Sequence, residues 1–377
     1  MIKIPQYTPS INTRDTIDAL SSYLLSNPWL TEFDKTKLFE LEIAKFIGSK
    51  HCIVVNNGTI SLSIALSVLG ILSGDEVMVP DLTMIATVNA MRFIGARPIF
   101  VDVDKDTLCL DVNKTIERWI MHDISHFKSI KAIIYVALNG RCNKDIKKLR
   151  NFCDFNKVKL IIDAAQAFGS EYDEKSISLY GHIGSYSFSP QKTITTGQGG
   201  ALVTDDDDIA KKIRCFKDFG REVSGSDDHK YFGINSKFTD IQAVIGLEQM
   251  KNIKERVSKK RCIYDMYYDR LSLIQGIWMF NRRLGETPWF VDIYSENINE
   301  LATYLESVGI GTRKVYIPLH RQPCYAEKRN FSTAEHFSSQ GLWLPSSLTL
   351  SESNINDICN IIKDFMEKKW IAQLIKL

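Results

Sequence analysis

Lys192 lies in a segment dense in Ser, Thr and Gly, between two short apolar runs that predict strands. An amine in such a loop can act as a nucleophile and form a Schiff base, provided that its surroundings lower its pKa. Most loop lysines are instead solvated charges, and the lysine by itself fits that description too. The nearby glycines, Gly197, Gly199 and Gly200, lack the Gly-Lys-Ser/Thr ending of a nucleoside-triphosphate loop, which excludes that kind of site.

Asp163 directly follows an apolar run that predicts a strand. It is therefore expected at the carboxyl edge of a sheet, where open α/β folds bind ligands. A carboxylate buried there needs a partner, because leaving it unpaired is costly, and a protonated ring nitrogen of a cofactor would serve. The alternative is that Asp163 caps the following helix, and the residues alone support the two interpretations about equally.

Asn57, Gly58 and Thr59 stand between a predicted strand and a predicted helix. A glycine lets the backbone approach an anion, and the start of a helix offers free N–H groups, so this turn suits a phosphate. An ordinary turn with a capping asparagine explains the same residues. Alone, that simpler interpretation is favoured, because short glycine motifs are common.

The elements that position these residues follow from the hydrophobic pattern between about residues 50 and 204, where short apolar runs alternate with helical patterns. This predicts βαβ units and a largely parallel sheet covered on both faces. The predicted strands are 51–55, 76–79, 98–103, 131–136, 158–162, 186–188 and 200–204, and the predicted helices are 59–72, 84–93 and 209–216. Four aspartates at 205–208 resemble an acidic metal site, but capping of the last helix explains them better, and no metal is expected.

The pattern changes after Met250. A long charged helical stretch, 251–273, predicts a bridge between domains, and the later runs predict a smaller α+β unit. These runs are 289–294, 298–308, 313–316 and 355–366. The expected domains are 1–250, with an N-terminal arm, and 251–377, and the apolar tail 370–377 is expected to dock on the protein.

The composition is that of a globular protein, with 377 residues, 44% of them hydrophobic, and a net charge of +2. The balanced charge gives no reason to expect nucleic acid or an anionic membrane as a partner. The eight cysteines are dispersed without metal-ligand spacing, which is typical of a reducing compartment. No apolar stretch is long enough for a signal peptide or a membrane span, so we expect a cytoplasmic protein.

Taken in order, these parts resemble the DegT family of sugar aminotransferases, from about Asn27 to Phe365. The matching segments are 57–59, 74–80, 95–102, 163–166, 187–192, 196–200, 233–242 and 309–320. The resemblance implies the fold of pyridoxal phosphate (PLP)-dependent transferases of fold type I. In that fold a large domain, with a mostly parallel sheet sandwiched by helices, is joined to a smaller C-terminal α+β domain. It also implies PLP as the cofactor.

The resemblance also implies residue roles. Lys192 would hold PLP covalently and move a proton between the donor's α-carbon and the cofactor, while Asp163 would keep the pyridine nitrogen protonated. Gln166 would bond the phenolic oxygen. The other implied cofactor contacts are Gly58, Thr59, Ile60, Met84, Ser187 and Asn235. Asn235 would reach the phosphate from a neighbouring subunit, which implies a homodimer with shared active sites.

Several positions depart from the family pattern. Met84 stands where an aromatic side chain usually stacks on PLP, and Ala137-Leu138-Asn139-Gly140 replaces a usual His-x-Tyr-Gly. The candidate substrate contacts are Thr31, Asn139, Arg221, Lys230, Arg313 and His320. Some of the changed positions border the substrate side of the site, so the acceptor is expected to differ from the common sugars of the family.

The resemblance implies amino transfer from L-glutamate to the ketone of a nucleotide-linked keto-deoxysugar, for O-antigen or capsule biosynthesis. The lysine at position 192 favours amino transfer, because a few family members have histidine there and dehydrate their sugar instead. Two alternatives stay open. One is the same chemistry on a smaller phosphorylated ketone such as dihydroxyacetone phosphate, and the other is a PLP-binding regulator without turnover.

Overall fold

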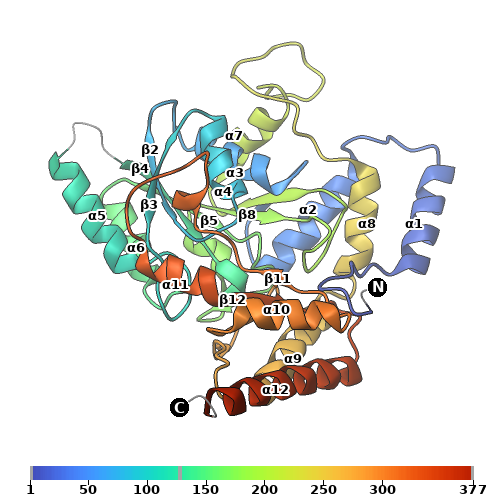
Figure 1. Ribbon diagram of the computed structural model, residues 1–377. Coiled ribbons are helices and arrows are strands. Elements are labelled where there is room, and N and C mark those ends of the chain that lie inside the picture. Colours follow the sequence, from blue (N-terminus) through green and yellow to red (C-terminus); the bar gives the residue numbers. More distant parts are fainter. Residues whose placement is uncertain (1–2, 126–129, 375–377) are drawn as a thin grey trace.

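A computed structural model describes residues 3–125 and 130–374 of the chain (Figure 1). Its centre is a seven-stranded sheet with the order β1-β9-β8-β5-β4-β2-β3. The strands are β1 (His51–Val55), β2 (Glu76–Pro80), β3 (Arg97–Val101), β4 (Ile130–Val136), β5 (Lys159–Asp163), β8 (Ile183–Ser187) and β9 (Gly200–Thr204). Strand β9 runs antiparallel to both neighbours, whereas the remaining pairs are parallel. The predicted strands and the mostly parallel sheet are confirmed.

Helices flank this sheet because its strands are buried and apolar along nearly their whole length. The helices of this part are α3 (Gly58–Val68), α4 (Ala86–Phe93), α5 (Val112–Ser125), α6 (Ile146–Phe155) and α7 (Asp207–Lys217). Helix α3 packs against α4 and α7, while α5 packs against α6. A small hairpin, β6 (Glu171–Tyr172) and β7 (Lys175–Ser176), stands apart from the sheet. The predicted helices are confirmed with shifted ends.

The aspartates at 205–208 do cap a helix. Asp206 is the N-cap of α7, and its carboxylate accepts a hydrogen bond from the amide of Ile209 at 2.9 Å. Asp207 pairs with Lys50 and His51, each at 2.6 Å. The capping interpretation is therefore confirmed for Asp206, whereas the carboxylate of Asp207 pairs with basic side chains.

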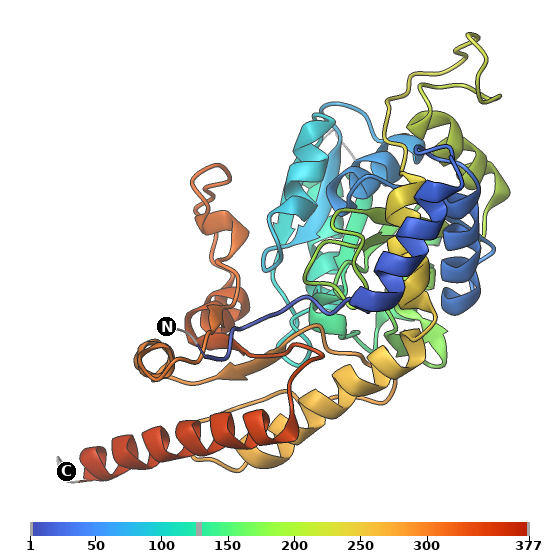
Figure 2. The same ribbon diagram turned by 90° about the vertical axis from the view of Figure 1, so that its right-hand side faces the viewer.

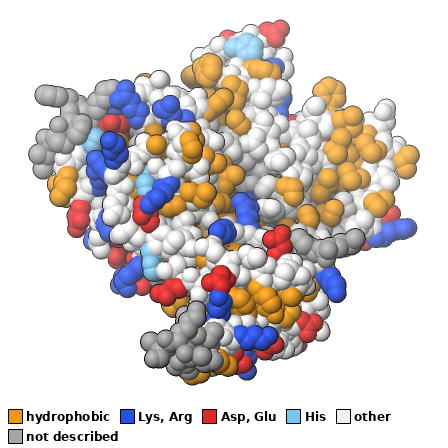
Figure 3. Space-filling model, in the orientation of Figure 1, with side chains coloured by type: hydrophobic (Ala, Val, Ile, Leu, Met, Phe, Trp, Pro, Cys, Tyr) orange, Lys and Arg blue, Asp and Glu red, His pale blue; other side chains and the backbone are white. Residues whose placement is uncertain are grey.

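Besides α5 and α6, the helices that were not predicted include α1 (Thr13–Leu25), α2 (Asp34–Ile47) and α8 (Asp240–Met250). Helix α1 buries only Thr16 of its residues, and its Ile17 and Leu24 are 52% and 50% exposed. It packs against α8 at one edge of the molecule (Figure 1). Leu25 and Trp29 are exposed there, and Figure 3 shows hydrophobic side chains gathered over this part of the surface.

The second half contains a separate hydrophobic cluster between about residues 263 and 366. Its elements are α9 (Ile253–Leu271), β10 (Val291–Tyr294), α10 (Ile298–Ser307), β11 (Arg313–Lys314), α11 (Ser332–Gln340), β12 (Gly341–Leu344) and α12 (Glu352–Leu374). The strands form a three-stranded antiparallel sheet, and α12 runs beside α9 (Figure 2). The expected α+β unit is present, and the boundary near residue 250 stays a prediction.

The end of the chain differs from expectation. Helix α12 continues to Leu374, and the side chains of Trp370 and Ile371 are 46% and 52% exposed, so the described start of the tail is not docked. The last residues, 375–377, lie outside the described part of the chain. None of the described helices is long and apolar enough to cross a membrane.

Candidate active site

A cavity of about 510 Å³ lies at the carboxyl ends of β1, β2, β4, β5 and β8. Parallel α/β sheets bind their ligands at this edge, because the loops that follow the strands meet there. Of the residues predicted for the site, those lining the cavity are Gly58, Thr59, Ile60, Met84, Asp163, Gln166, Ser187, Lys192 and Arg313. Three segments that carry weak signals separately in the sequence therefore form one site.

The Lys192 amine faces the cavity from the loop between β8 and β9. Its Nζ lies 4.1 Å from the centre of the Trp289 ring, and the ring nitrogen of Trp289 donates to the carbonyl of Gln191 at 2.7 Å. Burial lowers the pKa of Lys192 to about 8; Asp163 acts in the opposite direction, and Arg313 lowers the pKa further. Near neutral pH a larger fraction of this amine is therefore unprotonated, and so nucleophilic, than of an ordinary exposed lysine.

Asp163 ends strand β5 and is buried, with 5% of its surface exposed. Its carboxylate accepts hydrogen bonds from Thr87 Oγ1 at 2.8 Å and from the amide of Ala165 at 3.1 Å. Burial raises its pKa, against the two hydrogen bonds and the charge of Lys192, and within residues 3–125 and 130–374 no cation lies within ion-pair distance of it. No α-helix follows directly, so the helix-capping alternative is wrong. A buried carboxylate facing a cavity fits a protonated ring nitrogen.

The start of α3 forms another part of the cavity wall. Asn57 is the N-cap, and its side chain accepts from the amide of Ile60 at 2.9 Å. The first-turn amides of Gly58 and Thr59 have no acceptor within the helix, and the helix dipole favours an anion there. A Cβ atom at Gly58 would lie 2.8 Å from Cβ of Ser187, so only glycine lets these two segments approach. The arrangement fits the phosphate of PLP.

Gln166 connects the cavity to two other segments. Its Oε1 accepts from the amide of Asn139 at 2.8 Å, and its Nε2 donates to the hydroxyl of Tyr316 at 3.2 Å. Tyr316, Trp289 and Thr87 are site residues that the sequence analysis did not single out. Tyr316 lies within a segment matching the family, which is the signal that could have identified it; Trp289 and Thr87 had none.

The other predicted site residues do not line this cavity. Asn139 is buried and bonded to Phe290 and Asp292, and His320 is buried between Asp81 and Glu335. The remaining residues and their neighbours are Thr31 beside Thr239, Arg221 3.7 Å from Asp218, Lys230 2.7 Å from Glu222, and Asn235 beside Asp218. Direct substrate contact by the side chains of Asn139 and His320 is therefore not supported within one chain, because both side chains are hydrogen-bonded to other residues of the protein.

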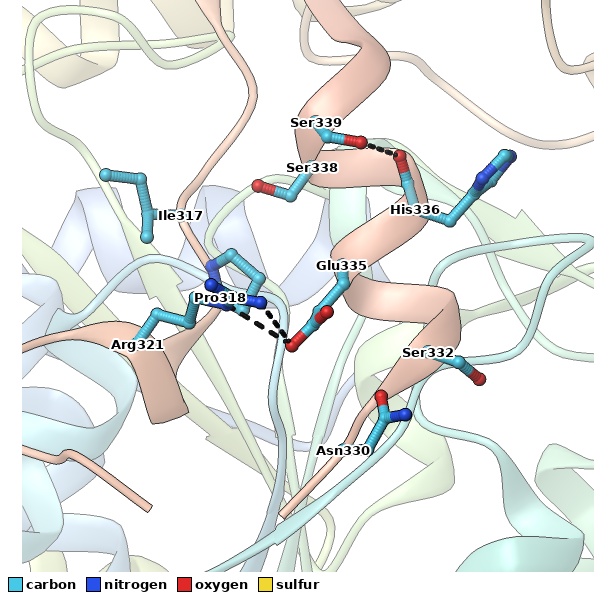
Figure 4. A pocket seen from close by; sticks show the side chains of 9 residues that line it. All are labelled: Ile317, Pro318, Arg321, Asn330, Ser332, Glu335, His336, Ser338 and Ser339. Carbon is cyan, nitrogen blue, oxygen red and sulfur yellow. Dashed lines mark hydrogen bonds and ion pairs between the residues drawn. The ribbon is translucent and has the colours of Figure 1, made fainter. Parts of the chain in front are cut away.

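A second hollow, of about 560 Å³, lies between η3 (Leu319–Arg321) and α11 (Figure 4). Arg321 and Glu335 face each other across it at 2.9 Å, and Ser339 donates to the carbonyl of His336 at 2.8 Å. Its charged groups thus satisfy one another, and it has no amine like that of Lys192. We assign the active site to the cavity at the sheet edge.

The lowered pKa of Lys192 predicts how the apoprotein takes up PLP. The neutral amine is the reactive form, so the rate of covalent attachment should rise about tenfold per pH unit and level off above about pH 8. The measurement is the visible absorbance that develops after PLP is added at a series of pH values. A rate that is independent of pH between about 6 and 9 would contradict the buried environment of this amine.

Comparison with known proteins agrees with this site. Residues 11–363 match the profile of the DegT/DnrJ/EryC1/StrS aminotransferase family. Proteins named GDP-perosamine synthase from Escherichia coli O157:H7 and Vibrio cholerae are 35% and 32% identical, over 97% and 96% of this chain and 99% of each relative. A DegT DnrJ EryC1 StrS aminotransferase from Brucella abortus, a crystal structure, matches with a TM-score of 0.89 and 28% identity, covering 94% of this chain and 96% of that one. The chain therefore belongs to the DegT/DnrJ/EryC1/StrS family and is a PLP-dependent aminotransferase.

Proposed function

We propose that this enzyme moves the amino group of L-glutamate to the ketone of a nucleotide-linked keto-deoxysugar, giving 2-oxoglutarate and an amino sugar. The observation that carries the chemistry is the buried pair of Lys192 and Asp163 in the cavity at the sheet edge. The relatives named GDP-perosamine synthase favour a GDP-linked acceptor. Other relatives are named for polysaccharide biosynthesis or for UDP-sugar substrates, which supports a role in surface polysaccharide synthesis, of O-antigen or capsule.

The residues that line the cavity have different roles in the proposed reaction. Bound PLP supplies an electron sink for the α-carbon of the donor. Lys192 Nζ takes the proton from that α-carbon, and Asp163 holds the proton on the ring nitrogen. The amides of Gly58 and Thr59, with the hydroxyl of Ser187, bind the phosphate. These roles are supported by the lining of the cavity, which includes all five of these residues.

Arg313 suits the acidic substrates of this reaction. Its guanidinium lines the cavity and lies 5.3 Å from the centre of the Trp343 ring. Within the described parts of the chain, no carboxylate forms an ion pair with it. A guanidinium binds a carboxylate or phosphate with two parallel hydrogen bonds. We therefore propose that Arg313 contacts the glutamate carboxylate or the nucleotide phosphates.

We further propose a homodimer with shared active sites. Asn235 lies outside the cavity of its own chain, and Tyr231 and Phe232 nearby are 57% and 79% exposed. Exposed apolar side chains also cover the surface around α1 (Figure 3). Apolar surface of this kind favours association with a partner. Asn235 would then complete the phosphate site of the neighbouring subunit.

Sharing of the site predicts complementation between two inactive variants. Lys192→Ala and Asn235→Ala each damage every site in their own homodimers. After unfolding and refolding together, half of the dimers are mixed, and each mixed dimer has one intact site, so about a quarter of the wild-type activity should return. No recovery, with mixed dimers demonstrated by two affinity tags, would show that Asn235 serves its own chain.

The place of action is proposed to be the cytoplasm. All eight cysteines are free, and six of them are buried. Thiols that pack as small apolar residues are typical of a reducing compartment. We propose that the acceptor sugar is bound and aminated in that compartment.

The proposed reaction can be tested with purified enzyme, PLP and L-glutamate. A GDP-linked keto-deoxysugar is expected to yield equal amounts of 2-oxoglutarate and amino sugar, measured by mass spectrometry. UDP- and dTDP-linked keto-sugars and dihydroxyacetone phosphate are run beside it at equal concentrations. Turnover of dihydroxyacetone phosphate alone would overturn the sugar acceptor. If no amino donor gives any product, a regulator without turnover would be favoured.

A further inference from the structure

The loop that follows β4 holds an asparagine in an uncommon conformation. Asn139, within η1 (Leu138–Gly140), has φ 54° and ψ 28°, in the left-handed region. Asparagine tolerates this region better than most residues other than glycine. Only 2% of Asn139 is exposed, and it lies behind the cavity wall rather than in it.

The side chain of Asn139 ties the large sheet to the smaller unit. Its Oδ1 accepts from the amide of Phe290 at 2.7 Å, and its Nδ2 donates to the carbonyl of Phe290 at 2.9 Å. Nδ2 also donates to Asp292 Oδ1 at 3.0 Å. The side-chain amide thus bonds both the N–H and the C=O of Phe290, directly before β10, as the backbone of a neighbouring strand would.

Asp292 is anchored in turn. It is fully buried and lies in β10, and its other oxygen accepts from the hydroxyl of Tyr294 at 2.8 Å and from the guanidinium of Arg141. Arg141 stacks over the ring of Phe280, 4.1 Å from its centre. A buried carboxylate with this many partners is held firmly in place, because each lost partner leaves a charge uncompensated.

This anchored loop determines which way the Gln166 amide faces. The main-chain N–H of Asn139 donates to Gln166 Oε1, so the Nε2 group points to Tyr316 and the cavity. The opposite orientation would place two N–H donors against each other at 2.8 Å. One proton of Nε2 is used by Tyr316, and the other is left for a ligand oxygen.

We propose that Asn139 is a positioning residue. Together with Asp292 it holds the loop whose N–H group fixes Gln166 as a hydrogen-bond donor toward the phenolic oxygen of PLP, and it links the smaller unit to the cofactor. The proposal rests on PLP binding in this cavity. It does not depend on the identity of the acceptor sugar.

The test uses the full-length enzyme with PLP and no amino acceptor. Asn139→Gly keeps the left-handed backbone accessible but removes the ties to Phe290 and Asp292. A hydrogen bond to a charged oxygen favours its charged form, so loss of the donor should raise the pH midpoint of the visible absorbance change by about one unit. Gln166→Glu, which removes the donor directly, should give the same upward shift. Tyr264→Phe removes a 2.9 Å bond to the carbonyl of Phe280 and a 3.5 Å contact with Asp292, but it leaves the ties of Asn139 in place, so it should keep the wild-type midpoint.

The other outcomes decide against the proposal. If Asn139→Gly melts at a lower temperature but keeps the wild-type midpoint, Asn139 is structural only. If that variant does not fold, Asp292→Asn replaces it, because it keeps the size of the anchor but removes its charge; an unchanged midpoint there overturns the proposal equally. Failure of the wild-type enzyme to bind PLP would instead refute the proposed function itself.

Discussion

Lys192→Ala is expected to lower turnover by at least about 1,000-fold, because it removes both the covalent attachment of the cofactor and the base at the donor α-carbon. Alanine leaves the Trp289 ring and Asp163 in place, so the cavity keeps its other walls. The enzyme should also fail to develop the visible absorbance of attached PLP. Two measurements check this: 2-oxoglutarate formed from L-glutamate in the presence of acceptor, and the absorbance spectrum.

The matched control for this variant is Lys147→Ala. Lys147 is an exposed lysine that pairs with Asp173 at 2.6 Å and does not line the cavity, so its loss should leave turnover at the wild-type rate. Lys192→Arg keeps the positive charge but not the nucleophile, and it should be as inactive as the alanine variant. Turnover above about a tenth of the wild-type rate in either position-192 variant would refute the role of this amine.

Asp163→Asn is expected to lower kcat by about 100-fold or more, because a neutral amide cannot stabilise the proton on the cofactor ring nitrogen. The change nearly preserves size. Oδ1 can still accept from the amide of Ala165, whereas the Nδ2 group that replaces Oδ2 can only donate to Thr87 Oγ1. The carboxylate also raises the pKa of Lys192. Its loss should therefore move the pH midpoint of PLP attachment below about 8, in the direction of lower pH.

Measuring both kcat and the pH midpoint of PLP attachment distinguishes the effect of the Asp163 charge from the effect of its hydrogen bonds. Thr87→Ala removes the 2.8 Å bond to Asp163 but keeps the carboxylate, so its effect on kcat should be smaller and the attachment midpoint should move little. Stopped-flow absorbance gives the midpoint, and steady-state kinetics with L-glutamate gives kcat. A wild-type kcat and an unmoved midpoint in Asp163→Asn would show that the carboxylate does not face the ring nitrogen.

The sequence predicted the sheet well, and several of its candidate site residues line one cavity, for physical reasons that act locally. Buried strands such as 131–136 must be apolar, and helix starts such as that at Asp206 need capping oxygens. Strand ends also place Asp163 and Asn57 at one edge of the sheet, since parallel strands share the direction of their carboxyl ends.

The sequence signal was weaker where an element buries little. Helix α1 carries Ile17, Leu20 and Leu24 at helical spacing, but it buries only Thr16 in this chain, and the segment was not predicted as a helix. For the tail around Trp370 the prediction was wrong in the other direction. Its apolar residues predicted docking on the protein, but helix α12 simply continues there with these side chains exposed. The apolar side chains of both segments are about half exposed in the described chain, so apolar residues alone did not show whether these segments are buried.

The chain by itself thus determined the strands, the caps and the candidates for the reactive groups, since each depends on neighbouring residues. The partners of those groups were decided only by the tertiary structure. Trp289 and Tyr316 reach the cavity from segments about 100 residues beyond Lys192, and Asn139 turns away from it to bond Asp292. Such contacts depend on how whole layers pack, because an amide or a ring finds its partner only after the loops that carry it have been brought together.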